Sequence, residues 1–595
     1  MRKSLLLAIT AAAVVLAAAP ASRRSTAAGT GARTAPADLV LLNGNVITVD
    51  PRDRVAQAVA ITADKIVAVG TNAEIRALIG PSTQQVDLKG LTVTPGLLDA
   101  HAHFASGGVN RLFTLDLSYP EVKNLADVRA KLAERVARAA PGDWVDGRGW
   151  DEGKLDERRY IRATDIDPVS PNNPVRLTQT TGHYVVVNTV ALKLANITKD
   201  TPDPPGGTID RYPDGTPTGV LKEGASGLAR GRGGRGSGMP ADATEQGIRE
   251  LARAFNAEGM TGAKDPGIAQ DTWDAYKRVL AAGGLTVRIF ALWRGGSSPS
   301  RGKDLIAQVG SFTKPYESTG DDHLVSGGIK LYIDGSGGAR TAWLYDDWNK
   351  DFTGTDAGNK GYPTSSPDSI RALIRMFHDA GLHVAVHSIG DHGIDWVVDS
   401  YAEAEKVNPK PGLRHSIIHA NIPSDHAIAV MADLQKRFDA GYPEPSATFT
   451  WWIGDTYAGN FGPTRSVRLN PFRTFVSKGM TWANGSDYNV TPFPARYAIW
   501  SAVAREPLLG VYGKQPFGTA ESVDVHTALK AVTIWAARQM FLEKKIGSLE
   551  VGKYADIAVW DRDLYRVPTA QLKDLECQMT IFNGRVVFKR QGGKL

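Results

Sequence analysis

The chain has 595 residues, of which 42% are hydrophobic and 22% are charged, and its formal net charge is +6. This composition is typical of globular proteins and excludes a fibrous or globally disordered chain. The positive excess is small for this length and forms no dense basic stripe, which argues against a nucleic-acid partner. The single cysteine, Cys577, has no second thiol to pair with and is interpreted as a structural residue.

The first residues are organised like a secretory signal peptide. Met1-Arg2-Lys3 precedes an apolar run from Leu5 to Ala19, which ends in the small-x-small site Ala19-Pro20-Ala21. A membrane anchor is the alternative, but the run is short and rich in alanine. We therefore expect cleavage after residues 1–21, a disordered leader over 22–36, and a secreted or periplasmic protein without a stable membrane anchor.

Short runs rich in Val, Ile and Thr occur at both ends of the remaining chain, as in β-strands. Near the N-terminus they cover residues 37–50, 58–70 and 86–94, and near the C-terminus residues 546–560 and 577–589. Strand-rich segments that flank a long middle predict one composite β-sandwich, formed by residues 37–94 together with 538–595.

The middle of the chain, residues 95–537, alternates strand-like runs with helical segments such as Ser366–Ala380 and Ser424–Asp439. This alternation is typical of βα units and predicts an α/β protein built on a (β/α)8 barrel. The eight candidate strands are residues 91–104, 260–265, 285–293, 327–334, 383–387, 415–420, 446–450 and 480–487.

The gap between the first two candidate strands far exceeds the roughly 30 residues of one βα unit. An inserted domain is therefore predicted within the barrel, over residues 105–238. It ends with the glycine-rich tract 231–238, which lacks the Gly-Lys-Ser/Thr of a phosphate loop. We interpret this tract as a flexible return to the barrel.

Histidines and a carboxylate lie at the expected C-terminal ends of several strands. His101 and His103 are two residues apart, so on a strand both face the same side, which Asp99 shares. Active sites of such barrels lie at the C-terminal strand ends, where the chain also carries His387, His419 and Asp487. Neutral imidazoles and carboxylates that converge in this way suit zinc or a related divalent ion. In contrast, His378, His383, His392 and His415 fall at opposite strand ends, in a helix or in a loop, and are interpreted as structural.

Lys330 lies on the fourth candidate strand, and the residues alone leave two interpretations open. Carboxylation by carbon dioxide would turn it into an anionic oxygen ligand that bridges two metal ions. Alternatively it is an ordinary lysine paired with Asp334 or another carboxylate, and spacing alone favours this alternative. A protonated lysine beside two dications would be repelled.

Several motifs together resemble the amidohydrolase superfamily, most closely its YtcJ-like branch, the amidohydrolase 3 family. The resemblance spans about residues 37–589. It rests on Pro95-Gly-Leu-Leu-Asp-Ala-His-Ala-His103, Gly182-His-Tyr-Val-Val-Val-Asn188, Ile329-Lys-Leu-Tyr-Ile-Asp-Gly335, Arg340-Thr-Ala342, His387-Ser-Ile-Gly-Asp391, Ile418-His-Ala420, Gly485-Ser-Asp487 and Gly547-Ser-Leu-Glu-Val-Gly-Lys-Tyr-Ala-Asp-Ile557.

This resemblance implies the barrel, the terminal β-sandwich and the inserted domain. It also implies two divalent metal ions, expected to be zinc, with a carboxylated Lys330 in the metal site. The implied metal-site residues are His101, His103, Lys330, His387, His419 and Asp487. The chain departs from the family in two places, because no acidic residue precedes His419 and the stretch 446–452 lacks the usual Gln-Pro-x-His pattern. The second departure puts inferences about the substrate in doubt.

These residues lead to the hypothesis of a hydrolase that cleaves a C–N bond in an amide, an N-substituted formamide or a cyclic amide. One metal ion is assigned to His101 and His103, and the other to His387 and His419, with Lys330 between them. A metal-bound hydroxide then attacks the carbonyl carbon, and Asp487 takes its proton and delivers it to the leaving nitrogen. A deaminase or an ester or lactone hydrolase on the same site is the alternative, and a non-catalytic exported binding protein is least favoured because the ligands are retained.

Candidate contacts to a small-molecule substrate come from the barrel walls and the insertion. For each residue singly, ordinary packing or loop anchoring is the stronger explanation. A homodimer is compatible with the sequence, which does not determine the oligomeric state. The candidate contacts are His183, Glu223, Arg340, Trp343, Trp451 and Trp452.

Overall fold

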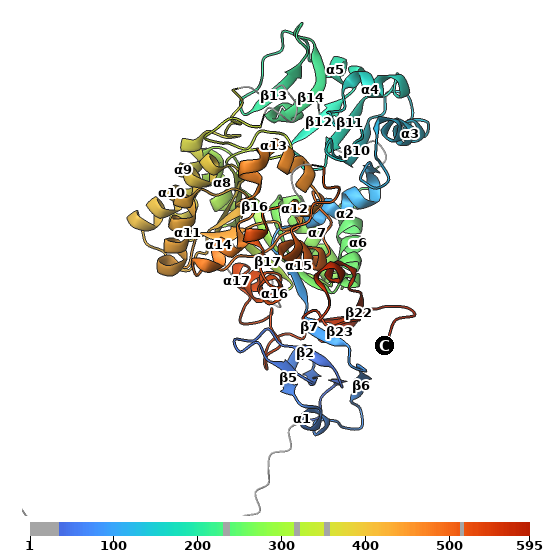
Figure 1. Ribbon diagram of the computed structural model, residues 1–595, viewed down its shortest axis with the longest axis vertical. Coiled ribbons are helices and arrows are strands. Elements are labelled where there is room, and N and C mark those ends of the chain that lie inside the picture. The colour runs from blue at the N-terminus through green and yellow to red at the C-terminus, as the bar shows by residue number, and fades with distance from the viewer. Residues whose placement is uncertain (1–34, 230–238, 314–321, 350–357, 512–516) are drawn as a thin grey trace, which may run out of the picture.

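The computed structural model describes residues 35–229, 239–313, 322–349, 358–511 and 517–595. The expected signal peptide, almost all of the leader and the glycine-rich tract 231–238 lie outside these residues. Three layers follow one another along the long axis (Figure 1): sheets from both chain ends, a central sheet with its helices, and the sheet of the insertion. In the described part of the chain, no helix has the length and apolarity needed to cross a membrane.

The central sheet is parallel, curled and seven-stranded, in the order β20-β19-β18-β17-β16-β15-β8. Its strands are almost wholly buried and rich in Val, Ile and Ala, as expected for a parallel sheet covered by helices. They are β8 (Leu97–Asp99), β15 (Met260–Ile268), β16 (Arg288–Arg294), β17 (Leu324–Tyr332), β18 (Val384–Ser388), β19 (Ser416–His419) and β20 (Tyr442–Glu444).

Amphipathic helices between these strands cover the outside of the sheet. Two of them coincide with the predicted helical segments, and local caps explain their bounds. Ser366 accepts a hydrogen bond from the Ser369 amide at the start of α9, and Ser424 does the same for Ala427 at the start of α11. The helices are α6 (Ala243–Ala257), α7 (Gln270–Ala281), α8 (Pro299–Val309), α9 (Pro367–Asp379), α10 (Asp391–Val407) and α11 (Asp425–Phe438).

The seventh and eighth candidate strands need correction. The seventh strand is β20, at Tyr442–Glu444, and the predicted strand 446–450 is wrong because Thr448–Trp451 forms helix α12. Prolines at 443 and 445 lack the amide hydrogen that a longer ladder needs. Residues 480–487 form no regular strand either. They run between β20 and β8 and form only isolated backbone hydrogen bonds with them in the described structure, such as the bond from Ala100 N to Asn484 O at 3.0 Å.

In the described residues after α12, five further α-helices follow. The first candidate strand, residues 91–104, also needs correction. It is two strands in different sheets: β7 (Thr92–Pro95) belongs to the terminal layer, and β8 belongs to the central sheet. The helices are α13 (Gly454–Ser466), α14 (Phe472–Ser477), α15 (Ala495–Ala504), α16 (Val525–Ala531) and α17 (Ile534–Gln539).

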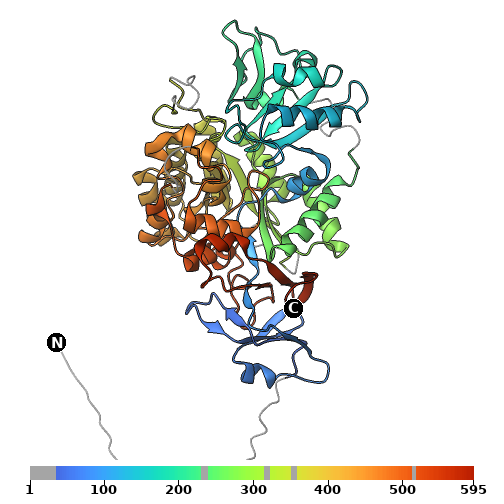
Figure 2. The ribbon, with the colours of Figure 1, turned by 45° about the vertical axis from the view of Figure 1, so that its right-hand side comes forward.

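The insertion forms a six-stranded sheet of its own, next to the central sheet (Figure 2). Within the predicted insertion, residues 105–238, helix α2 (Phe104–Phe113) packs closely on α6, since a Cβ on Gly108 would lie 2.0 Å from Gly247 O. The sheet contains β9 (Leu115–Asp116), β10 (Val145–Trp150), β11 (Val175–Gln179), β12 (Tyr184–Val187), β13 (Gly207–Arg211) and β14 (Pro217–Glu223), with α3 (Leu125–Val136), α4 (Ala163–Ile166) and α5 (Thr189–Leu194).

Both chain ends meet in two small sheets below the central one. In the larger, β7 pairs antiparallel with β21, so Pro95 lies opposite Ile557. One hydrophobic cluster joins the two sheets and includes Leu41, Val59 and Ile581. The sheets contain β1 (Leu39–Leu42), β2 (Asn45–Ile47), β3 (Val55–Ala56), β4 (Ala58–Thr62), β5 (Lys65–Gly70), β6 (Gln84–Asp87), β7, β21 (Ile557–Trp560), β22 (Cys577–Phe582) and β23 (Arg585–Lys589), next to α1 (Asn72–Arg76).

Candidate metal centre

Two histidines and a carboxylate meet where β8 ends. His101 Nε2 and His103 Nε2 each lie 3.4 Å from Asp487 Oδ1, although Asp487 is far away in sequence. Asp99 brings the two segments together, because its carboxylate accepts the backbone amides of His101 at 3.0 Å and Ser486 at 2.9 Å. The pairing therefore depends on a buried anchor inside the sheet.

Two more histidines complete the group from the neighbouring strand ends. The His387 and His419 rings are 4.6 Å apart, and the His419 and His101 rings are 5.1 Å apart. His387 Nε2 lies 2.9 Å from the Gly335 carbonyl oxygen. When Nε2–H donates to this carbonyl, Nδ1 of His387 keeps a free lone pair. Metal-binding histidines are usually oriented by such a hydrogen bond from their other ring nitrogen.

Lys330 lies on β17 inside the sheet, with its side chain almost fully buried. Its Nζ has no hydrogen-bond partner among the described residues. The pairing with Asp334 is not formed, since Asp334 accepts the backbone amides of Trp343, Ile389 and Gly390 at 3.0, 3.1 and 2.8 Å. Burial lowers the pKa of Lys330 to about 7, so a neutral amine is accessible near neutral pH.

Burial also sets the protonation of the imidazoles. It lowers the pKa of His101 and of His387 well below the usual range, and the pKa of His419 to about 3. For Asp487 burial raises the pKa, but the neighbouring imidazoles of His101 and His103 outweigh it and hold the pKa well below its ordinary value. Neutral imidazoles beside an ionised carboxylate are the forms that bind metal ions.

These donors fit a divalent metal. Both ring nitrogens of His101, Nδ1 of His419 and Nζ of Lys330 are buried without a hydrogen-bond partner in the described structure. Leaving such atoms unpaired costs about 1–3 kcal/mol each, and metal coordination would satisfy the unprotonated ones. His101, His103 and Asp487 each also offer a ligand atom within 4.8 Å of the others.

A second buried group, His378, Glu405 and His415, lies at the opposite end of the strands, and the ring nitrogens of its histidines form hydrogen bonds within the protein. His378 Nδ1 lies 2.9 Å from His415 Nε2, and His378 Nε2 lies 2.7 Å from the Asn408 carbonyl. His415 Nδ1 accepts the Val384 amide at 3.1 Å. These bonds occupy the ring nitrogens, in agreement with the structural interpretation of these histidines.

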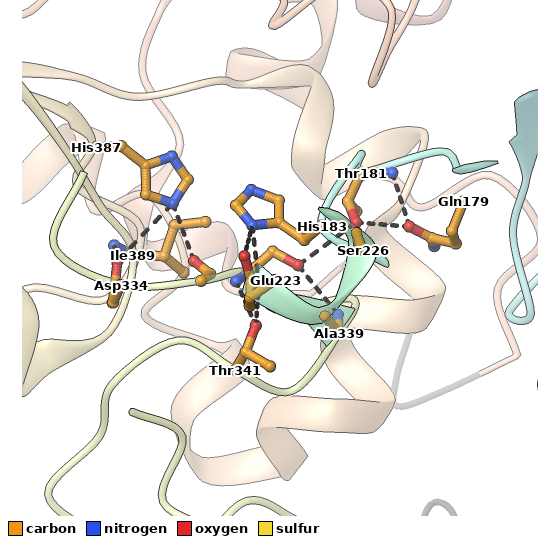
Figure 3. Close-up of polar contacts among 12 residues, drawn as sticks. Gln179, Thr181, His183, Glu223, Ser226, Asp334, Ala339, Thr341, His387 and Ile389 are labelled. Carbon is orange, nitrogen blue, oxygen red and sulfur yellow. Dashed lines mark hydrogen bonds and ion pairs between the residues drawn. The ribbon is translucent and has the colours of Figure 1, made fainter. Parts of the chain in front are cut away.

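A cavity of about 480 Å³ opens over the metal-site residues. The insertion closes one side of it with Arg148, Thr181, Gly182, His183 and Glu223. His183 Nδ1 lies 3.0 Å from both Glu223 carboxylate oxygens, as Figure 3 shows, and its ring lies 5.0 Å from that of His387. Burial alone would lower the pKa of His183, but Glu223 outweighs it and raises the pKa.

The candidate substrate contacts divide into two groups. His183 and Glu223 line the metal-site cavity, and Trp452 lines the cavity beside it. Arg340, Trp343 and Trp451 do not line either of these two cavities. Arg340 lies over the Tyr160 ring, Trp343 stacks on His392 at 3.7 Å, and Trp451 packs against Trp452, Tyr497 and Trp500.

Three residues around the cavity adopt a left-handed backbone. His419, Asp487 and Glu223 have φ values of 71°, 54° and 48°. Each such residue costs about 1–3 kcal/mol unless its surroundings impose the conformation, and these conformations cluster at functional sites. Backbone strain therefore coincides with the residues that the sequence assigns to chemistry.

A curled parallel sheet with histidines, a lysine and a carboxylate at its strand ends defines a metal-dependent hydrolase. Comparisons give the family. The model of the amidohydrolase family matches residues 84–588, so the chain belongs to this family. It is thus a metal-dependent amidohydrolase, an enzyme that acts on carbon–nitrogen bonds.

Two relatives and one solved structure illustrate the similarity. The chain is 29% identical over 561 residues to N-substituted formamide deformylase from Arthrobacter pascens, covering 93% of this chain and 99% of the relative. It is 30% identical over 547 residues to Protein LONG AFTER FAR-RED 3 from Arabidopsis thaliana, covering 88% of each. An uncharacterized metal-dependent hydrolase from Pyrococcus horikoshii has the same fold, with a TM-score of 0.68 at 22% identity over 89% of this chain and 99% of that one.

Proposed function

We propose that the protein is an exported hydrolase that cleaves the C–N bond of an amide, an N-substituted formamide or a cyclic amide with two zinc ions. The convergence of four imidazoles, three of them buried, with Asp487 and a Lys330 whose Nζ has no hydrogen-bond partner among the described residues carries this proposal. The similarity to an N-substituted formamide deformylase supports the bond type. In architecture, we propose a (β/α)8 barrel in which residues 480–487 take the place of the eighth strand, with an inserted domain and a β-sandwich of both chain ends.

When bound, the metal ions would lower the pKa of water and polarise the scissile carbonyl. His101 and His103 would hold one ion, and His387 and His419 the other. Asp487 lies close enough to the first pair to take a proton from the attacking water and to deliver it to the leaving nitrogen. An amine leaves readily only when it is protonated, so losing Asp487 should reduce kcat more than metal content.

Lys330 would join the two halves of the site as a carboxylated bridging ligand. The reaction forms a bond between the neutral Nζ and the carbon of carbon dioxide and releases one proton. The buried environment favours the neutral amine that this reaction needs, and no carboxylate pairs with Nζ in the described residues. The anionic product replaces repulsion between a cation and two dications with attraction.

Metal analysis and lysine variants test the proposal together. We expect about two divalent ions per chain, and a loss of most metal and activity in Lys330→Ala. Short carboxylic acids should restore part of both, because they supply the missing oxygens. Lys330→Arg should not be rescued, since its fixed charge fills the space. The exposed His426, paired with Asp399, provides a control variant, His426→Ala, that should keep both metal ions.

Two outcomes would contradict the proposal at different levels. A fully active protein without metal would rule out the metal-dependent mechanism. Electron density for a bare Lys330 amine in active, fully metallated protein would rule out only the bridging role. A panel of amides, formamides, lactones and aminated heterocycles would show whether C–N hydrolysis is preferred over ester hydrolysis or deamination.

A further inference from the structure

A second cavity of about 520 Å³ adjoins the metal-site cavity. Arg148, Asn110 and Asn489 line both, so the two spaces meet at these side chains. The second cavity has a mixed polar and apolar lining. Its apolar part is formed by Leu115, Ala254, Ala257, Trp452 and Phe493, among others. A group bound there would lose contact with water while remaining connected to the metal-binding residues.

Arg148 is an unpaired cation at this junction. It lies on β10 of the insertion, and one of its terminal amino groups donates to the Thr180 carbonyl at 3.2 Å. Its Nε is buried without a hydrogen-bond partner, and no salt bridge to it occurs among the described residues. A guanidinium keeps its charge at all physiological pH values, so this donor group needs an anionic or strongly polar partner.

The acidic groups of the second cavity do not supply that partner. Glu258 pairs with Arg496 at 2.9 Å. Asp116 is the strand neighbour of Arg148, but it is exposed and its carboxylate accepts the Ser118 amide at 2.9 Å instead. The other cation of this cavity, Arg111, pairs with Glu250 at 3.4 Å. Arg148 also interacts electrostatically with Asp487 of the adjoining cavity, but the described residues form no salt bridge between the two, so the guanidinium can still take up an anionic group of a ligand.

The chain direction indicates which part of a substrate reaches Arg148. Asp487, the proposed proton donor to the leaving nitrogen, is followed directly by Tyr488 and the residues up to Pro494 that form one wall of the second cavity. His183, Glu223 and Asp334 line the metal-site cavity but not the second one. A leaving nitrogen placed near Asp487 can therefore extend its substituent past Arg148 into the second cavity.

We propose that Arg148 is a specificity-determining residue that binds an anionic group on the nitrogen substituent of the substrate, while the second cavity holds the apolar body of that substituent. The inference rests on the proposed C–N hydrolysis and narrows its substrate class. The preferred substrates are amides whose leaving amine carries both a carboxylate and an aromatic or aliphatic group.

Matched substrates test the charge. The metal-loaded protein is assayed with N-formylphenylalanine and with N-formyl-2-phenylethylamine, which differs by lacking the carboxylate. The wild type should show a kcat/KM at least about 10-fold higher for the acid, as one charged hydrogen bond contributes about 1.5–3 kcal/mol. Arg148→Gln should remove this preference mainly through KM. Asp116→Asn is the control and should keep the preference.

A filling variant tests the cavity. Ala257→Phe should lower kcat/KM for N-formylphenylalanine and spare N-formylalanine, which has no bulky group to accommodate. Equal kcat/KM for the acid and the neutral compound in the wild type would overturn the role of Arg148, while turnover of both would still support C–N hydrolysis.

Calorimetry provides a readout that does not depend on turnover. Phenylalanine, the amine product, should bind the metal-loaded wild type more tightly than 2-phenylethylamine does, and Arg148→Gln should abolish the difference. Equal binding of both amines would overturn the inference even if neither formamide is hydrolysed. Absence of metal binding would instead contradict the proposed function.

Discussion

Replacing His383 should make the protein less sensitive to acid. His383 begins the segment that leads into β18, at the strand end opposite the metal-site residues, and it is fully buried. Its Nδ1 lies 3.1 Å from the Leu413 carbonyl, and its ring packs between Phe290 and Phe541. His383→Asn removes the titrating ring but keeps a side-chain amide that can reach the same carbonyl.

The magnitude follows from the pKa of His383 in the folded state. Burial, helped by the charge of Lys264, lowers this pKa to about 3, whereas an unfolded histidine titrates near 6.5. Below pH 6.5 the unfolded state binds the extra proton first, so stability falls as the pH falls. At pH 4.5 the difference of about 2 pH units corresponds to about 2.7 kcal/mol, at about 1.36 kcal/mol per unit.

Urea unfolding of the metal-free protein at pH 7.0 and pH 4.5 measures this effect. The loss of unfolding free energy between the two pH values should be about 2–3 kcal/mol smaller in His383→Asn than in the wild type. His426→Asn, at an exposed histidine, should not show a smaller loss. The variant can be less stable than the wild type at pH 7.0 without affecting this result. For each protein, only the change in unfolding free energy between pH 7.0 and pH 4.5 is compared. A difference under about 1 kcal/mol would refute the buried, neutral state of His383.

Three further predictions concern the metal centre and the chain ends. Gly485→Ala should lose most of its metal, because the new Cβ would lie 2.4 Å from His101 Cβ. Elemental analysis measures this loss. The control Gly227→Ala should keep the metal, because no atom lies within 4 Å of the added Cβ. Asp334→Ala should lower the urea midpoint by an amount equivalent to about 2–5 kcal/mol, since three buried amides lose their acceptor; an unchanged midpoint would contradict this. Expression in a secreting host should give a mature N-terminus near Ser22, and recovery of intact residues 1–21 on cytoplasmic protein would contradict export.

The positions of the metal-site residues could be predicted because they depend on local rules. Side chains two residues apart share one face of a strand, and parallel strands of a curled sheet end at the same rim. His387 and His419 follow from the second rule. The first rule does not hold for His101 and His103 as predicted, because β8 ends at Asp99 and both histidines lie in the segment between β8 and α2. The structure brings all four rings together without any long-range information having been needed for the prediction.

The predicted strand at 446–450 shows where local rules fail. Its residues are rich in Thr and aromatics, which favour strands, yet residues 448–451 form a helix. The ladder ends earlier because Pro443 and Pro445 cannot donate to a neighbouring strand. The eighth segment is also irregular: Gly485 must approach the His101 backbone closely, and this contact is not encoded in strand propensity.

Arg148 was missed because its importance arises from tertiary structure. In the sequence it is one charged residue in the strand-like stretch 145–150, and an exposed position on an edge strand would explain it equally well. Only the packing of the insertion beside the metal centre shows that its Nε is buried and unpaired. A charged side chain at a strand end of an inserted domain is the available sequence signal, and it is a weak one.

The proposed metal-binding residues and the walls of the cavity come from different parts of the fold. This separation would allow the substrate specificity to change while the proposed metal site stays the same. The proposed ligands lie on the central sheet and the segment that follows Ser486, where Asp99 holds them in place. Arg148 and His183 come from the insertion, whose own sheet carries their backbone. Glu223 pairs with His183, whereas Arg148 forms no salt bridge among the described residues and can take up a charged group of a substrate. Substitution of this side chain can therefore change which amines are accepted without disturbing a metal ligand, whereas a change at Asp99 must affect both His101 and Asp487.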